Sequence, residues 1–261
     1  MTRHRDRNRT PSHREGAGQG NLVWLWGTHA VTAALKNSAR KCRKLLVGPG
    51  ADPEILRLAA KAKAQVEQTD LVTIDRVLPK DAVHQGLALH AFPLEEHDVA
   101  GVLELAKRPC CLVLLDQVTD PHNFGAVIRS AAAFGASAII VQDRHSPPLH
   151  GVLAKAASGA LETVPIVEVV NISRALDQLG KDGFLRLAFA DGATESLEQM
   201  NLDRDIVLVF GSEGDGIRRL TRESCDVTVR LPTTDAMPSL NVSNAAAVAL
   251  YAWSVGRTGS S

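Results

Sequence analysis

The stretch Asp116–Arg129 reads DQVTDPHNFGAVIR, and it joins the apolar run CCLVLL at residues 110–115 to a segment of helical character. Two later stretches are similar. Phe210–Gly216 reads FGSEGDG, and Leu231-Pro232 leads on to Ser239–Asn244, which reads SLNVSN. Each follows a short apolar run and precedes a helix-like segment, so each is predicted to lie at a strand-to-helix turn. Because α/β sheets bind ligands at such turns, the three stretches predict one shared site.

Around these stretches the C-terminal part of the chain alternates between β-like and helical segments. Strands are expected at residues 111–118, 138–141, 164–170, 185–190, 206–210 and 227–231, and helices at 125–134, 150–158, 173–180, 217–224 and 241–257. This alternation predicts an α/β fold with a mostly parallel sheet covered on both faces. The pattern alone indicates a Rossmann-like sheet, but the first turn lacks the glycine fingerprint of a dinucleotide site.

Residues upstream of this sheet predict a second, smaller unit. Helices are expected at residues 29–37 and 53–64, and strands at 41–47 and 86–91. The length of 261 residues suits two modest domains. We therefore expect a disordered basic arm at 1–20, a small domain at 21–95, a linker at 96–108 and a larger domain at 109–258.

Composition excludes several classes of protein. The four cysteines, Cys42, Cys110, Cys111 and Cys225, have no spacing typical of disulfide frameworks or zinc sites, and the nine histidines show no metal-ligand spacing. Cys110 and Cys111 are expected to be buried thiols. No apolar run reaches membrane-spanning length. We therefore expect a reduced, cytoplasmic protein that needs neither a metal nor a membrane.

The first 20 residues carry five arginines against one aspartate and one glutamate, with almost no apolar residues. Such a segment cannot bury enough surface to fold alone. It suits contact with RNA phosphate, and an unspecialised solvated tail fits equally well. It lacks the apolar core of a secretory signal, and its acidic residues disfavour an organelle transit peptide.

The order and spacing of the three C-terminal stretches resemble the signature motifs of the SpoU-type ribose 2′-O-methyltransferases of the SPOUT superfamily, over roughly residues 110–257. Upstream, WGTHAV at residues 26–31 and HQG at residues 84–86 look like parts of the small RNA-binding domain, related to ribosomal protein L30e, that precedes the catalytic domain in the rRNA-modifying branch. The resemblance implies a deep trefoil knot that holds S-adenosylmethionine, and a homodimer. Periodicity cannot reveal a knot, because knots are nearly absent from proteins.

The resemblance also assigns roles to single residues. It implies a catalytic cluster made of Asn123, Arg129, Glu213, Ser239 and Asn241. Within this cluster, Asn123 is expected to position Arg129. It implies that the backbone around Gly211, Leu231 and Leu240 binds the cofactor. The residues alone permit plainer interpretations, because Asn123, Ser239 and Asn241 are good helix caps and Glu213 suits a helix start.

A basic cluster in the small domain contains Lys36 and Arg40 and, at the following strand, Lys41, Arg43 and Lys44. We expect Lys41, Arg43 and Lys44 to contact RNA; an ordinary solvated face is the alternative. The resemblance implies that the chain methylates the ribose 2′-hydroxyl of a guanosine in 23S rRNA. A tRNA ribose methyltransferase, a non-catalytic ribosome-assembly factor of the same fold and a nucleotide-dependent oxidoreductase remain as alternatives.

Overall fold

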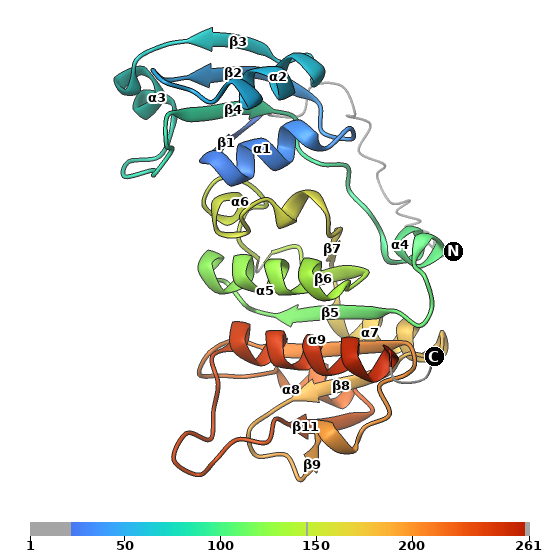
Figure 1. The fold of residues 1–261 in the computed structure, drawn as a ribbon. Coiled ribbons are helices and arrows are strands. Elements are labelled where there is room, and N and C mark those ends of the chain that lie inside the picture. Colours follow the sequence, from blue (N-terminus) through green and yellow to red (C-terminus); the bar gives the residue numbers. More distant parts are fainter. Residues whose placement is uncertain (1–21, 145, 259–261) are drawn as a thin grey trace, which may run out of the picture.

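The computed structural model describes residues 22–144 and 146–258, and the predicted basic arm at residues 1–20 lies outside them. These residues form two units, each built on one sheet, stacked one above the other in Figure 1. No helix among them is long and apolar enough to cross a membrane.

The upper unit is a four-stranded mixed sheet in the order β1-β4-β2-β3. Its elements, in chain order, are β1 (Val23–Trp26), α1 (Thr28–Lys36), β2 (Cys42–Val47), α2 (Pro53–Lys61), β3 (Gln65–Gln68), α3 (Leu71–Val77) and β4 (Leu87–Ala91). The expected helices and the strands at β2 and β4 are confirmed. The sequence did not reveal β1, β3 or α3.

The lower unit is a seven-stranded parallel sheet in the order β7-β6-β5-β10-β8-β11-β9. Its strands are β5 (Cys111–Asp116), β6 (Ala138–Gln142), β7 (Ile166–Val169), β8 (Leu185–Phe189), β9 (Glu195–Ser196), β10 (Ile206–Gly211) and β11 (Val227–Arg230). The expected α/β fold is confirmed, with only the short edge strand β9 unforeseen.

Helices cover both faces of the parallel sheet. They are α4 (Val99–Leu105), α5 (Pro121–Phe134), α6 (Val152–Ala156), α7 (Ile172–Lys181), α8 (Arg219–Glu223) and α9 (Val242–Thr258), with short 3-10 turns η1 (Ala160–Glu162) and η2 (Leu197–Gln199). One buried cluster places α5 and α9 over alternate β5 and β10 side chains. A second places α4 and α7 on the other face.

Strand β5 is buried along its whole length, which explains its unbroken apolar run. Cys110 and Cys111 are buried as predicted, and burial raises the pKa of the Cys110 thiol to about 11. This thiol therefore stays protonated at neutral pH and behaves as a small apolar side chain.

The two units contact each other through α1, which lies against α6 and η1 (Figure 1), and through β1, which also contacts α6. At one end of α1, the Gln85 side-chain oxygen accepts hydrogen bonds from the Thr28 amide, at 3.0 Å, and from Lys155 Nζ, at 2.9 Å. Beyond the other end, Arg40 pairs with Glu162 of η1 at 2.5 Å, and both side chains are buried. The upstream HQG motif therefore helps to join the units.

Arg40 is therefore a structural residue. Besides the pair with Glu162, its Nη1 donates to the Phe92 carbonyl oxygen at 2.9 Å. Its inclusion in an exposed basic cluster was wrong, because the arginine is only 5% exposed.

Candidate active site

The candidate site lies where the carboxyl ends of β5 and β10 meet. The two strands are paired in parallel, and their last residues, Asp116 and Gly211, face each other in register. The first and second signature stretches leave the sheet from these residues. The third leaves from the end of β11 and returns to the start of α9 beside them.

Side chains from all three stretches form one hydrogen-bonded cluster. Asn123 Nδ2 donates to Glu213 Oε1 at 2.9 Å. Asn241 Nδ2 donates to Asn123 Oδ1 at 3.1 Å and also to Glu213 Oε1. One carboxylate oxygen thus accepts from two amides, which fixes all three side chains relative to one another.

The first turn of α5 places Asn123 in this cluster. Asp120 is the N-cap, because its side chain accepts a hydrogen bond from the His122 amide at 2.9 Å, and Pro121 occupies the first helical position. The expectation that Asn123 caps the helix was therefore wrong. Asn123 lies inside the first turn, and its side chain is free to reach the next loop.

Glu213 lies in a tight loop, not at a helix start, since α8 begins only at Arg219. The loop is closed by a bridge between Ser212 and Gly216, and Gly214 and Gly216 have φ of 91° and 67°. Such φ values favour glycine. At Gly211 a Cβ atom would lie 2.0 Å from the carbonyl carbon of Gly216, so only glycine lets the loop fold back this closely.

Asn241 immediately precedes α9, as expected of a capping residue. Its Oδ1 accepts from the Ser243 amide at 2.8 Å and from Ser243 Oγ at 2.6 Å. The amide oxygen is therefore engaged by the helix start while the amide nitrogen points to the cluster. This arrangement fixes which way the side chain of Asn241 faces.

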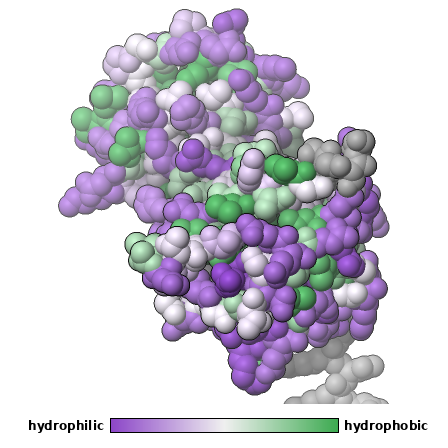
Figure 2. Space-filling view, turned by 60° about the horizontal axis from the view of Figure 1, so that its bottom comes forward, coloured by the Kyte–Doolittle hydropathy of each residue, from purple (hydrophilic) through white to green (hydrophobic). Residues whose placement is uncertain are grey.

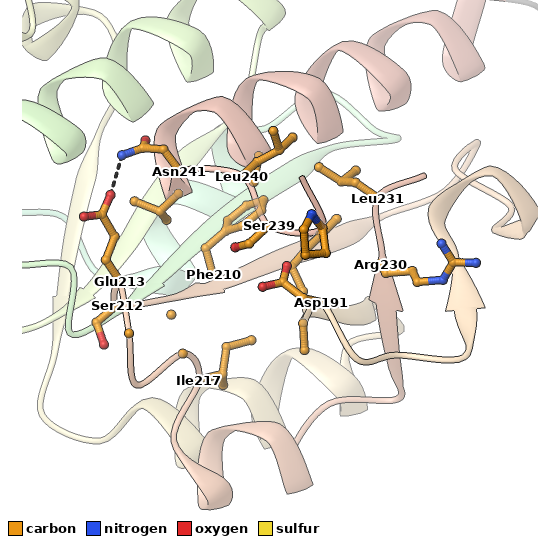
Figure 3. A pocket seen from close by; sticks show the side chains of 18 of the residues that line it. Asp191, Phe210, Ser212, Glu213, Ile217, Arg230, Leu231, Ser239, Leu240 and Asn241 are labelled. Carbon is orange, nitrogen blue, oxygen red and sulfur yellow. Dashed lines mark hydrogen bonds between the residues drawn. The ribbon is translucent and has the colours of Figure 1, made fainter. Parts of the chain in front are cut away.

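A cavity of about 400 Å³ opens beside the cluster. The three predicted cofactor residues, Gly211, Leu231 and Leu240, all line it, and so does Ser239. In Figure 3, Glu213 and Asn241 lie at one end of the cavity, Asp191 and Arg230 lie toward the other, and Ser239 lies between them. The second and third stretches thus form a large part of its wall.

An ion pair beneath the loop was not foreseen. Asp116 is fully buried, and its carboxylate accepts from Arg218 Nε at 2.7 Å and from the Arg218 amide at 3.1 Å. Arg218 Nη2 also donates to Gln142 Oε1 at 2.9 Å. The pair ties the far end of the Glu213 loop to the ends of β5 and β6. Its signal was an aspartate ending an otherwise apolar strand.

Other cavity residues were also missed. Asp191, Arg222 and Arg230 line the cavity, and nothing in their local sequence distinguishes them from ordinary surface charges. Only the pairing of β8 with β10 and β11 brings these segments together.

The structure does not bring Arg129 into the cluster. Arg129 is exposed on α5, and among the described residues its side chain makes no hydrogen bond or ion pair and does not line the cavity. Lys41, Arg43 and Lys44 lie in the upper unit, on or next to β2. Lys41 and Arg43 are exposed, whereas Lys44 pairs with Glu67 at 2.7 Å. Among the described residues, no group of three His, Cys, Asp or Glu side chains is arranged to hold a metal ion.

Comparison with known proteins agrees with this geometry. Residues 110–251 match the SpoU rRNA Methylase family, and residues 24–97 match the domain described as RNA 2'-O ribose methyltransferase substrate binding. The chain is 37% identical to the 23S rRNA (guanosine-2'-O-)-methyltransferase RlmB of Pseudomonas putida, across 88% of this chain and 95% of the relative. It is 38% identical to that of Pseudomonas aeruginosa, across 87% and 94%.

Among solved structures, the SpoU methyltransferase AviRb from Streptomyces viridochromogenes, in complex with the cofactor AdoMet, superposes with a TM-score of 0.80. The sequences are 20% identical, and the match covers 95% of this chain and 94% of AviRb. The TrmH/SpoU tRNA modifying enzyme of A. aeolicus matches over only 59% of this chain, with a TM-score of 0.54. These structures share the fold.

Proposed function

This chain belongs to the SpoU rRNA methylase family, and from that premise we propose that it transfers a methyl group from S-adenosylmethionine to the ribose 2′-hydroxyl of a guanosine in 23S rRNA. The observation that carries the proposal is the cluster of Asn123, Glu213 and Asn241 at one end of a ligand-sized cavity. Similarity to 23S rRNA guanosine methyltransferases along nearly the whole chain supports this substrate.

The cavity fits S-adenosylmethionine, which supplies an activated methyl group on a sulfonium. A volume of about 400 Å³ lies within the usual range of about 300–1,000 Å³ for small-molecule sites. Its lining combines apolar side chains, such as Leu231 and Leu240, with carboxylates and an open backbone at Gly211. We assign Gly211, Leu231 and Leu240 to cofactor binding on this basis.

Methyl transfer requires the 2′-hydroxyl to be aligned with the methyl carbon and to lose its proton. Glu213 fixes the two asparagine amides at the cavity edge, so the cluster can orient a ribose without rearranging, which is a large part of catalysis by positioning. Ser239, on the cavity wall beside them, belongs to the same proposed catalytic group.

Arg129 is proposed to hold the substrate phosphate. A guanidinium stays protonated in proteins, so a phosphate clamp is physically easier than a role as general base. Since Arg129 lies outside the cavity of its own chain, its proposed target is RNA bound across a subunit boundary. This requires a homodimer.

The face of α9 that would form such a dimer is apolar. Val248, Tyr251 and Val255 follow one another at helical spacing and are 44%, 57% and 50% exposed in the single chain. On the surface seen in Figure 2, hydrophobic residues occur as patches among hydrophilic ones. We propose that this stripe pairs with its copy around a twofold axis.

We also propose the superfamily's trefoil knot for the segment that follows β11. Supporting it, β10 lies between β5 and β8, and the chain returns from β11 past the Glu213 loop to pack α9 on α5. Pulling the chain from its two ends should leave it shorter than a linear chain of 261 residues, and a full-length extension would exclude the knot.

The proposed division is an arm at 1–20, a substrate-binding domain at 21–95, a linker at 96–108 and a catalytic domain at 109–258, working in the cytoplasm. The linker contains α4, which packs on the catalytic sheet. A tRNA substrate is disfavoured because the tRNA modifying enzyme matches only 59% of the chain. The intact cluster argues against a non-catalytic assembly factor.

The test is Glu213→Gln. It replaces the doubly accepting carboxylate by an amide, so the turnover of 2′-O-methylation should fall by about a hundredfold or more while the fold is retained. Glu223→Gln, on the exposed side of α8, should leave turnover unchanged. Labelled S-adenosylmethionine should bind to the wild type and NAD should not. Normal turnover of Glu213→Gln would refute the site.

A further inference from the structure

A stacked aromatic pair lies on the outer face of the upper sheet, remote from the cavity. The ring centroids of Trp24, on β1, and His90, on β4, are 4.4 Å apart, and the angle between the two ring planes is only 14°. Strand pairing aligns Trp24 with His90, and His90 with Lys44 of β2, so the three residues form one row across the sheet. All three are partly exposed.

The adjacent row on the same face has a different role. Trp26, Ala88 and Leu46 are buried and pack against Ile74 of α3 and Leu78 just beyond it. Helix α3 therefore covers one half of this face. Trp24 packs against this buried cluster, but Trp24, His90 and Lys44 all stay partly exposed. Trp24 lies on the edge strand, so no further strand of this sheet covers its outer side.

Positive charge lies beside the open row. The register of β2 shifts between Cys42 and Lys44, and the extra residue, Arg43, is exposed. Partial burial, followed by the positive charges of Arg43 and Lys44, lowers the pKa of His90, so its charged form is disfavoured. Lys44 is held by Glu67, whereas Arg43 has no recorded ion pair among the described residues.

We propose that Trp24 and His90 form a stacking platform for an unpaired RNA base, with Arg43 contacting the adjoining phosphate. A flat aromatic stack next to a cation matches the two features of a single-stranded nucleotide, its π face and its charge. A folded protein partner would be expected to require a larger apolar patch, and an acidic peptide would leave the stacked rings unused. The inference deepens the proposed function, since it places one RNA contact in the substrate-binding domain.

The platform can be tested by tryptophan fluorescence of the full-length protein titrated with a short, unstructured oligoadenylate. Stacking of a base on Trp24 should quench its emission. Trp24→Leu should remove this quenching and weaken binding about tenfold, since the base loses its stacking partner. Trp24→Phe keeps an aromatic face and should bind within about threefold of the wild type.

Arg43→Gln gives an independent readout that does not touch the stack. It should weaken binding and lower the dependence of log affinity on log salt by about one. Lys61→Gln, at the end of α2, is the matched control and should change neither by more than about twofold. Thermal unfolding and S-adenosylmethionine binding check that each variant is folded.

Two results would overturn the platform: unchanged quenching and affinity in Trp24→Leu, or Trp24 emission that acrylamide cannot reach in the RNA-free protein. The second would mean that the rings are not accessible to a base. The proposed reaction is tested separately by methyl transfer. Oligoadenylate binding without methylation would contradict the proposed reaction but not the platform. Methylation together with unchanged quenching and affinity in Trp24→Leu would contradict only the platform.

Discussion

At the scale of single residues, the candidate site has a hydrogen-bonded cluster and one arginine that lies outside it. Asn123, Glu213 and Asn241 bond to one another in the single chain, so their geometry is set before RNA arrives. Arg129 has no recorded partner among the described residues and lies outside the cavity. Cofactor binding and phosphate binding are therefore expected to be separable.

Arg129→Ala should abolish methyl transfer and leave S-adenosylmethionine affinity within about threefold of the wild type. The reason is that the side chain contributes nothing to the cavity wall. Arg129→Lys keeps the charge but loses the bidentate fork, so it should recover only part of the activity. Isothermal titration and a filter assay of labelled RNA provide the two readouts. Near-normal turnover of the alanine variant would rule out the central role of this residue.

At the scale of elements, α1 is attached at both ends to the segment α6–η1, which in turn packs on α5. The contact between α6 and α5 is close: a Cβ atom at Gly125 would lie 2.5 Å from the Cβ of Ala156. The upper unit is thus joined, through one short segment, to the helix that carries Asn123 and Arg129.

Glu162→Gln should weaken this contact between the two units. It removes the negative charge opposite Arg40 while both positions are buried, and breaking one side of a buried pair costs about 3–5 kcal/mol in the free energy of unfolding. Glu54→Gln, which breaks the exposed pair with Arg57, should cost at most about 1 kcal/mol. Urea unfolding measures both. Equal effects of the two variants would contradict a structural role for the buried pair.

Helix α9 carries the second prediction at this scale. Val248 is exposed in the single chain, so Val248→Glu should spare the fold of the protomer yet place a charge in the proposed dimer interface. Light scattering should show monomers, and methyl transfer should be lost. Val83→Glu, at a more exposed apolar position in the upper unit, is the control and should stay dimeric. A fully active wild-type monomer at assay concentration would contradict the dimer.

The sequence predicted the parallel sheet well because β5, β6 and β10 are buried strands separated by helical segments of ordinary length. It missed β3, whose residues QVEQ are all exposed and carry no burial pattern, and β1, whose apolar residues do not alternate. It also misplaced Glu213 at a helix start, because glycines beside an acidic residue suit both a cap and a tight loop.

Contacts between segments that are far apart in the chain could not be predicted from the sequence. Arg40 looked like part of a solvated basic cluster, and only the docking of α1 on η1 brings Glu162 to it. Asp116 and Arg218 are 102 positions apart and meet because β5 and β10 are neighbours. The motif residues that line the cavity could be named from the sequence, by contrast, because the family resemblance implied that they belong to one site.

For the whole molecule, the proposed function assigns the two units different tasks: the lower unit is proposed to hold the cofactor and align a ribose, and the upper unit is proposed to hold RNA. Because the two units contact each other, we expect the RNA to reach both at once. A substrate that engages only the lower unit should therefore be methylated poorly, which favours a large folded RNA over a short one.

The most direct measurement is the position of the methyl group. Purified protein, S-adenosylmethionine and unmodified 23S rRNA are incubated, and 2′-O-methyl nucleotides are mapped by reverse transcription at low nucleotide concentration. A tRNA pool is treated in parallel, with Glu213→Gln as the inactive control. The account predicts a new 2′-O-methyl group at a guanosine of the 23S rRNA and none in tRNA. Methylation of tRNA alone, or of neither RNA under conditions in which the cofactor binds, would contradict it.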